Sequence, residues 1–285
     1  MSKTIIGLGE LLWDVFSDGR RPGGAPANVA FHAQQLGNHG IVASRIGADE
    51  DGQKLSIWLH EKGLNIAFLQ CDEDHATGTV FVQIVDGEPE YTITENVAWD
   101  FMAYTPEWSR LAKTANAVCF ATLAQRNPTS AETIHRFLAE VPNDCLKVMD
   151  VNMRQPFFNK SVLHASLPFA DVLKLNADEK KAIGLIFGVS DPHKWLLEHF
   201  RISWICQTHG KDGAELITKD ASWFVKGESV DVSNGDAVGV GDAFLAALTT
   251  AILRKDAPEQ ALQFANRYAA KVATFKGAMP VFFLD

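Results

Sequence analysis

Cysteine is scarce in this sequence, and the few cysteines lie far apart. There are four among 285 residues and none stands in CxxC spacing, which argues against a disulfide framework and against a zinc site. The nine histidines are scattered without HExxH spacing, so they do not indicate a metal site either. We therefore expect buried free thiols at all four cysteines, Cys71, Cys119, Cys145 and Cys206.

Long apolar runs and an excess of positive charge are also missing. No apolar run approaches the roughly 18–20 residues that a membrane-spanning helix needs, and the first residues turn acidic too soon for a secretory signal. The formal net charge is −9 with a sequence pI near 5.5, which argues against a nucleic-acid surface. We expect a cytoplasmic protein with neither a membrane nor a nucleic acid as partner.

Two common glycine motifs for nucleotides are absent. No GxxxxGK[ST] segment occurs, so a P-loop is excluded. Gly7-Leu8-Gly9 resembles the start of a dinucleotide fingerprint, but Leu12 stands where the third small residue is needed and Glu10 would repel a pyrophosphate.

The composition that remains is that of a globular α/β protein. Hydrophobic residues make up 47% of the chain and charged residues 21%. Apolar runs typical of strands alternate with helical patterns, which predicts a doubly wound, mainly parallel sheet. The strands are expected at residues 5–8, 41–46, 117–123, 146–151, 172–175, 204–208, 214–218 and 223–225, and the helices at 29–37, 53–62, 107–113, 130–140, 162–167, 178–187, 192–199, 245–253 and 258–275.

One stretch departs from this alternation. Residues 79–85 and 91–94 are rich in β-formers and flank Asp86-Gly87-Glu88-Pro89, a pattern typical of a hairpin. Such an antiparallel insertion is often a lid or an interface element, and the alternative is an extra hairpin at a sheet edge.

The segment from Asn234 to Phe244 combines features that suggest chemistry on phosphate. Gly239 and Gly241 allow a tight turn, and the helix that follows presents free N–H groups and the positive end of its dipole to an anion. Asp242 conflicts with this, because a carboxylate repels phosphate unless it acts as a base on the attacking group. The alternative is an ordinary helix start with a first-turn aspartate.

Polar residues near the amino terminus are candidates for holding a hydroxylated ligand. Asp14 follows large apolar residues, and its carboxylate could accept hydrogen bonds from substrate hydroxyls or lie at a turn or sheet edge. Gly24 precedes a helix and allows close backbone approach, while Asn28 in its first turn either caps the helix or points into a site.

Residues 150–154 place a carboxylate, an amide and a guanidinium on alternate positions after a strand. On an extended chain Asp150, Asn152 and Arg154 would face the same way. Such a face could hold a partly anionic, hydroxylated substrate, with Arg154 suited to phosphate. An ion pair at a strand end is an equal alternative.

Two further strand ends carry polar residues. Asn176 begins a helix and could form a capping box with Glu179, or both could serve a hydrated Mg²⁺ beside nucleotide phosphates. Thr208, Gly210 and Gly213 lie in a sharp turn that could bind a nucleotide or simply connect two elements.

Taken together, these motifs resemble the PfkB, or ribokinase-like, family of carbohydrate kinases over essentially the whole chain. The most specific matches are the runs Gly23-Gly24-Ala25-Pro26-Ala27-Asn28-Val29-Ala30 and Asp236 to Phe244. Between them, residues 176–179 look like the family's NxxE element and residues 208–213 like its TxGxxG turn. The resemblance implies one kinase domain over residues 1–285, with a β lid formed by residues 10–22 and 75–100.

The resemblance also implies ATP-dependent phosphorylation of a sugar hydroxyl. Asp242 would be the base, with the backbone N–H groups of Gly239, Val240 and Gly241 as the anion hole. Asp14, Gly24, Asn28 and Arg154 would bind the sugar, and Glu179 with Asn176 would hold Mg²⁺ through water. Asn176, Thr208, Gly210, Gly213 and, on the last long helix, Asn266 would line the ATP site.

The substrate, a cation and a partner are further implications of this resemblance. The motifs look most like fructokinases, which act on the 6-hydroxyl of D-fructose; other ketoses, 2-keto-3-deoxygluconate and ribose are alternatives, as is a non-catalytic sugar-binding protein of the same fold. A Rossmann oxidoreductase is a more distant alternative. The lid could mediate a homodimer, and Ala237, Val238 and Val240 depart from the family pattern near a monovalent cation (K⁺) site.

Overall fold

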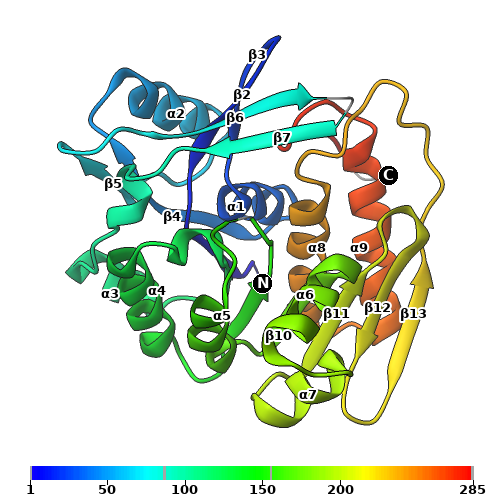
Figure 1. Cartoon of the computed structure of the whole chain (residues 1–285). Helices are drawn as coiled ribbons and strands as arrows, with labels where there is room; N and C mark the ends of the chain where they lie inside the picture. The colour runs from blue at the N-terminus through cyan, green and yellow to red at the C-terminus, as the bar shows by residue number, and fades with distance from the viewer. Residues whose placement is uncertain (1, 86–87, 155, 284–285) are drawn as a thin grey trace.

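The computed structural model describes residues 2–85, 88–154 and 156–283, and its centre is a large twisted sheet (Figure 1). The strand order is β13-β12-β11-β10-β9-β8-β1-β4-β5, in which β12 and β13 are antiparallel to their neighbours and the other pairs are parallel. The strands are β1 (Thr4–Leu8), β4 (His39–Gly47), β5 (Leu69–Asp72), β8 (Ala117–Ala121), β9 (Leu146–Asp150), β10 (Val172–Asn176), β11 (Trp204–Thr208), β12 (Gly213–Ile217) and β13 (Ser222–Lys226).

Helices cover both faces of this sheet, as the predicted doubly wound architecture requires (Figure 1). One layer contains α1 (Ala25–Gln35), α2 (Glu50–Glu61), α8 (Val240–Arg254) and α9 (Pro258–Ala273). The other contains α3 (Pro106–Ala112), α4 (Pro128–Glu140), α5 (Lys160–Ser166), α6 (Ala177–Phe187) and α7 (Pro192–His199). In addition, the described residues contain 3-10 helices at Ala98–Phe101, Leu123–Gln125, Leu167–Phe169 and Gly210–Asp212.

The central strands are buried on both faces, which explains their continuous apolar runs. Ile5, Ile6 and Leu8 of β1 are fully buried, with Ile5 packing toward α8 and Ile6 toward α3 and α4. Strand order reverses beside β1, because the chain goes first to β4 and later returns to β8 on the other side. This is the switch point at which doubly wound sheets bind ligands.

A second, smaller sheet lies beyond the carboxyl end of β1. Its order is β3-β2-β6-β7, formed by β2 (Leu12–Phe16), β3 (Gly19–Gly23), β6 (Gly78–Val85) and β7 (Glu88–Ile93), and it crosses the top of the molecule in the view of Figure 1. The predicted hairpin is present as β6 and β7. Strand β7 already begins at Glu88, and the predicted turn residues Asp86 and Gly87 lie outside the described residues.

Two expectations about the core and the segment boundaries need correction. Cys71 is exposed rather than buried, because β5 is the edge strand of the large sheet; the other three cysteines are buried, and all four are free. The first helix begins at Ala25 rather than at residue 29, and Pro26 occupies a first-turn position that suits proline.

In the part of the chain that the structure describes, no helix has the length and apolarity needed to cross a membrane.

Candidate functional site

A cavity of about 260 Å³ lies at the switch point, between the carboxyl ends of the central strands and the small sheet. Its walls come from the turn after β1, from β2, β6 and β7, from the start of α1, from the segment after β9 and from the start of α8. The polar or glycine residues in these walls are Glu10, Asp14, Gly24, Asn28, Asn152, Arg154, Gly239 and Asp242. The structure thus brings together the predicted sugar residues and the predicted base.

Asp242 is placed by the glycine turn in front of α8. Gly239 is the N-cap residue with φ of 72°, in the left-handed region that favours glycine, and a side chain there would collide with Ala278. Val240 and Gly241 are the first residues of α8, so their N–H groups belong to the first turn, where α-helices have no internal partners. Asn28 Nδ2 donates a hydrogen bond of 2.7 Å to Asp242 Oδ2, which fixes one oxygen of the carboxylate.

Three carboxyl groups line the cavity, and the pKa of each is raised; Glu10 is buried, whereas Asp14 and Asp242 are partly buried. Burial raises the pKa of Glu10 to about 7, with a further contribution from the charge of Asp242. Burial also raises the pKa of Asp14 to about 6, although Arg154 and Arg21 oppose it. The pKa of Asp242 rises to about 6 through burial, opposed chiefly by the Asn28 hydrogen bond. A carboxylate with a pKa near 6 is ionised at neutral pH and remains an effective proton acceptor.

Arg154 reaches the cavity by a different backbone path from the one predicted. Strand β9 ends at Asp150 and Asn152 has a φ of 43°, so residues 150–154 are not extended and do not share one face as expected. Asn152 and Arg154 still line the cavity, whereas Asp150 lies beneath it. The Arg154 guanidinium donates to Met153 O at 3.2 Å and lowers the pKa of all three cavity carboxyls.

A buried ion pair lies close to the glycine turn in front of α8. Lys174 Nζ donates to Asp150 Oδ2 at 2.6 Å, and a side chain built on Gly241 would lie 3.5 Å from the same nitrogen. Burial alone would lower the pKa of Lys174, but the charges of Asp150 and Glu179 outweigh burial and raise it. This lysine therefore stays positive beside the turn that is predicted to bind phosphate.

Glu179 and Asn176 form the capping box that the sequence suggested as one alternative. Asn176 Oδ1 accepts from Glu179 N at 2.9 Å, and Glu179 Oε2 accepts from Asn176 N at 2.8 Å. The other carboxylate oxygen, Glu179 Oε1, accepts from Met153 N at 2.8 Å, which ties the start of α6 to the segment carrying Arg154. Burial, followed by the charge of Asp150, raises the pKa of Glu179.

The carboxylates of Asp150 and Glu179 fit a hydrated cation better than one bound directly. Among the described residues, no group of three or more histidine, cysteine, aspartate or glutamate side chains is arranged to hold a metal ion. Asp150 Oδ1 is buried without a hydrogen-bond partner in that part of the chain. Two buried carboxylates with one lysine leave a local excess of negative charge, which suits Mg²⁺ bound through water.

The predicted nucleotide residues lie apart from the cavity, in a row along the large sheet. Asn176 and Thr208 pair at the ends of β10 and β11, and Gly213 begins β12 next to them. Gly213 pairs with Lys226, whose carbonyl, like that of Val225, accepts a hydrogen bond from Asn266 Nδ2. Gly210 lies in the turn before β12 with φ of 58°. The row is continuous from Asn176 to Asn266, and none of its members is among the residues that line the cavity.

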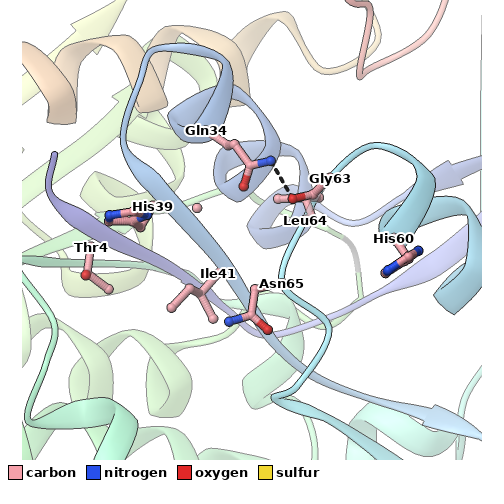
Figure 2. Close-up of a pocket in the computed structure, with 9 residues that line it drawn as sticks. Thr4, Gln34, His39, Ile41, His60, Gly63, Leu64 and Asn65 are labelled. Carbon is pink, nitrogen blue, oxygen red and sulfur yellow. Dashed lines mark hydrogen bonds between the residues drawn. The ribbon is translucent and has the colours of Figure 1, made fainter.

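A second hollow, of about 450 Å³, lies at the opposite end of the strands (Figure 2). Thr4 and His39, which begin β1 and β4, line it, and Gln34 Nε2 donates to Gly63 O at 2.6 Å across it. It contains none of the residues singled out in the sequence. Because ligands of such sheets bind at the carboxyl ends of the strands, the cavity around Asp242 is the better candidate.

Sequence reasoning missed two residues of the site. Glu10 was considered only as an obstacle to a dinucleotide, and Lys174 was not considered at all. A signal existed for both: Glu10 lies two residues after a buried strand, and Lys174 interrupts the apolar run of β10. A charge in such a place is normally paired or functional.

Comparisons with known proteins show the family of the chain. Residues 4–282 match the pfkB family carbohydrate kinase family. A fructokinase of Escherichia coli is 30% identical over an alignment covering 98% of this chain and 96% of that protein.

Solved structures share the fold over nearly the whole chain. An uncharacterized sugar kinase from Pyrococcus horikoshii is 28% identical with a TM-score of 0.86, covering 97% of this chain and 93% of that one, and it has also been solved in complex with ATP. A fructokinase with bound ATP from Xylella fastidiosa has a TM-score of 0.88 at 22% identity, covering 98% and 94%.

Proposed function

The chain belongs to the pfkB family of carbohydrate kinases, and from that premise we propose that it transfers the γ-phosphoryl group of ATP to the 6-hydroxyl of D-fructose. The observation that carries the proposal is the position of Asp242. Its partly buried carboxylate lines a cavity rich in hydrogen-bond acceptors and directly follows a glycine turn at a helix start. A base beside an anion-binding turn is what transfer to a hydroxyl requires.

In the proposed reaction Asp242 accepts the proton of the sugar hydroxyl as its oxygen attacks the γ-phosphorus. The new O–P bond forms while the bond to the bridging oxygen of ADP breaks, and ADP leaves with that electron pair. The N–H groups of Gly239, Val240 and Gly241 would stabilise the transferring phosphoryl group, and Lys174 would add positive charge behind them. Catalysis is then mainly positioning and charge stabilisation.

The sugar would lie in the cavity with its hydroxyls toward the carboxylate and amide groups. Asp14, Gly24 and Asn28 would hold hydroxyls, and Arg154 would face the sugar or the transferred phosphoryl group. The 30% identity to the Escherichia coli fructokinase and the Asp150-x-Asn152-x-Arg154 pattern support fructose. Another sugar, such as 2-keto-3-deoxygluconate or ribose, is the nearest alternative.

ATP and Mg²⁺ would occupy the row along the large sheet. Thr208, Gly210, Gly213 and Asn266 would contact the nucleotide, while Glu179 and Asn176 would hold Mg²⁺ through its water ligands. The ion would neutralise charge on the phosphates. A monovalent cation such as K⁺ stays a prediction near Asp236, whose carboxylate accepts from Val238 N and Gly277 N at 3.0 Å each.

The small sheet would act as the lid of a single kinase domain. Leu12, Phe16, Val80 and Ile93 give it an apolar surface over the cavity, so closure would exclude water and limit ATP hydrolysis. A homodimer through this sheet and a cytoplasmic location are part of the same proposal.

An assay of ADP release over a panel of sugars tests the proposal. We expect the highest kcat/KM with D-fructose and MgATP, with the product carrying phosphate at position 6. A higher kcat/KM with ribose or 2-keto-3-deoxygluconate would replace the substrate but keep the enzyme class. Binding of fructose and ATP without sugar-dependent ADP release would instead support a non-catalytic regulatory protein.

A further inference from the structure

Glu10 is a buried carboxyl group of the cavity to which the proposed reaction gives no role. It follows β1 through Gly9, is 2% exposed and lines the cavity with Asp242. Its Oε2 has no hydrogen-bond partner among the described residues. A buried carboxylate with an unused oxygen is costly to keep, so its position calls for an explanation.

Glu10 is connected to Asp242 through the start of α1. The backbone N–H of Ala25, the first residue of that helix, lies near enough to the Glu10 carboxyl group to lower its pKa. The backbone carbonyl of Glu10 packs against Gly24, which leaves no room for a side chain there. Asn28 N then donates to Gly24 O at 3.0 Å, and Asn28 Nδ2 donates to Asp242 Oδ2 at 2.7 Å. The contacts run without a gap from Glu10 to the proposed base.

Glu10 and Asp242 are also connected by charge. The charge of Asp242 disfavours ionisation of Glu10, and Coulomb repulsion is mutual, so an ionised Glu10 makes Asp242 hold a proton more strongly. The other charged groups facing Glu10 are Arg154, from the segment after β9, and Asp14, from β2. Ionisation of one acid therefore opposes ionisation of the other.

We propose that Glu10 is a positioning residue for Asp242, because it holds the start of the helix that carries Asn28 and adds a second negative charge beside the base. The inference rests on the proposed function only in taking Asp242 as the base. It does not depend on which sugar is phosphorylated.

The kinetic test compares wild type with Glu10→Gln and Glu10→Asp, using the sugar that wild type turns over fastest. The wild-type kcat/KM should rise with pH in two steps, near 6 and near 7, as the two acids ionise. Glu10→Gln should show one step and a plateau lower by about 10–100-fold, since a misplacement of about 1 Å can cost on the order of 10²-fold. Glu10→Asp keeps the charge and should keep both steps.

Two steps with full activity in Glu10→Gln would overturn the proposal, as would a single step in wild type.

A readout without turnover uses the melting temperatures at pH 8 of Glu10→Gln, Asp242→Asn and the double variant. Both single changes relieve the same repulsion, so their shifts should not add. Additive shifts would overturn the coupling, even if fructose proves not to be the substrate.

Discussion

Asn28 and Asp242 stand 214 residues apart in the chain and are joined by a hydrogen bond of 2.7 Å between Asn28 Nδ2 and Asp242 Oδ2. The bond links the first turns of α1 and α8, which pack side by side on one face of the sheet (Figure 1). Since the amide donates to one oxygen only, Asp242 Oδ1 is left for a hydroxyl proton. The two glycine-rich motifs of the sequence thus meet at the proposed base.

Replacing Asp242 by Asn should remove turnover and spare the fold. Asn has nearly the same shape but no basicity, so we expect kcat to fall by about 10²–10⁴-fold, the usual contribution of a general base. Sugar binding measured by calorimetry should change far less. Asp144→Asn, at an exposed aspartate between α4 and β9, is the matched control and should leave kcat unchanged. Near-normal turnover in Asp242→Asn would remove Asp242 as the base.

Arg154→Ala should lower kcat/KM by about 10–100-fold, because a hydrogen bond to a charged group contributes about 1.5–3 kcal/mol. Loss of the guanidinium also removes the charge that lowers the pKa of Asp242. The acid limb of the pH profile should therefore move to higher pH. The control is Arg136→Ala on α4, whose side chain is 62% exposed. Unchanged kinetics in Arg154→Ala would place this arginine outside the reaction.

Asp14 should make the folded protein less stable as the pH rises. Its pKa is raised chiefly by burial, from 3.8 to about 6, so the folded state binds more protons than the unfolded state between these values. The unfolding free energy then falls with rising pH, by on the order of 2–3 kcal/mol for this group. Urea unfolding at pH 4.5 and 7.5 should show Asp14→Asn gaining stability over wild type at the higher pH. Asp18→Asn, at an exposed position in the turn between β2 and β3, should show no such gain.

The sequence predicted the large sheet well because its signals are local. Buried parallel strands such as Val172–Asn176 are short apolar runs, and their order with the helices leaves few topologies. Strand β3, with the sequence Gly-Arg-Arg-Pro-Gly, has no strand pattern and was expected only as part of the lid implied by the family resemblance. It forms because it pairs with β2, a tertiary interaction that no local pattern reports.

The candidate site was predicted in part for a similar reason. Asp14, Asn28 and Asp242 each lie in a local sequence motif that can be recognised without knowledge of the fold. Lys174 brings positive charge to the site because it pairs with Asp150 and lies close to Gly241. Both relationships exist only after the strands assemble. The left-handed backbone of Asn152 is likewise set by the folded segment, so the alternation predicted for residues 150–154 was wrong.

Gly239→Ala should disrupt the glycine turn in front of α8 by steric collision more than by backbone strain. At Gly239, with φ of 72°, a new Cβ would lie 2.5 Å from Ala278 Cβ and 2.6 Å from Ala278 Cα, so the segment after α9 or the turn must move. Gly188→Ala is the matched control, because Gly188 has φ of 68° with nothing within 4 Å of a new Cβ.

Left-handed backbone costs an alanine about 1 kcal/mol at either position. We expect Gly188→Ala to lose about that much unfolding free energy and no activity. Gly239→Ala should lose more of both, since the collision displaces the N–H groups of Val240 and Gly241 from the position where they would meet the phosphoryl group. Equal losses of stability in the two variants, with kcat intact in Gly239→Ala, would mean that the turn tolerates the shift and that its backbone is not the anion hole.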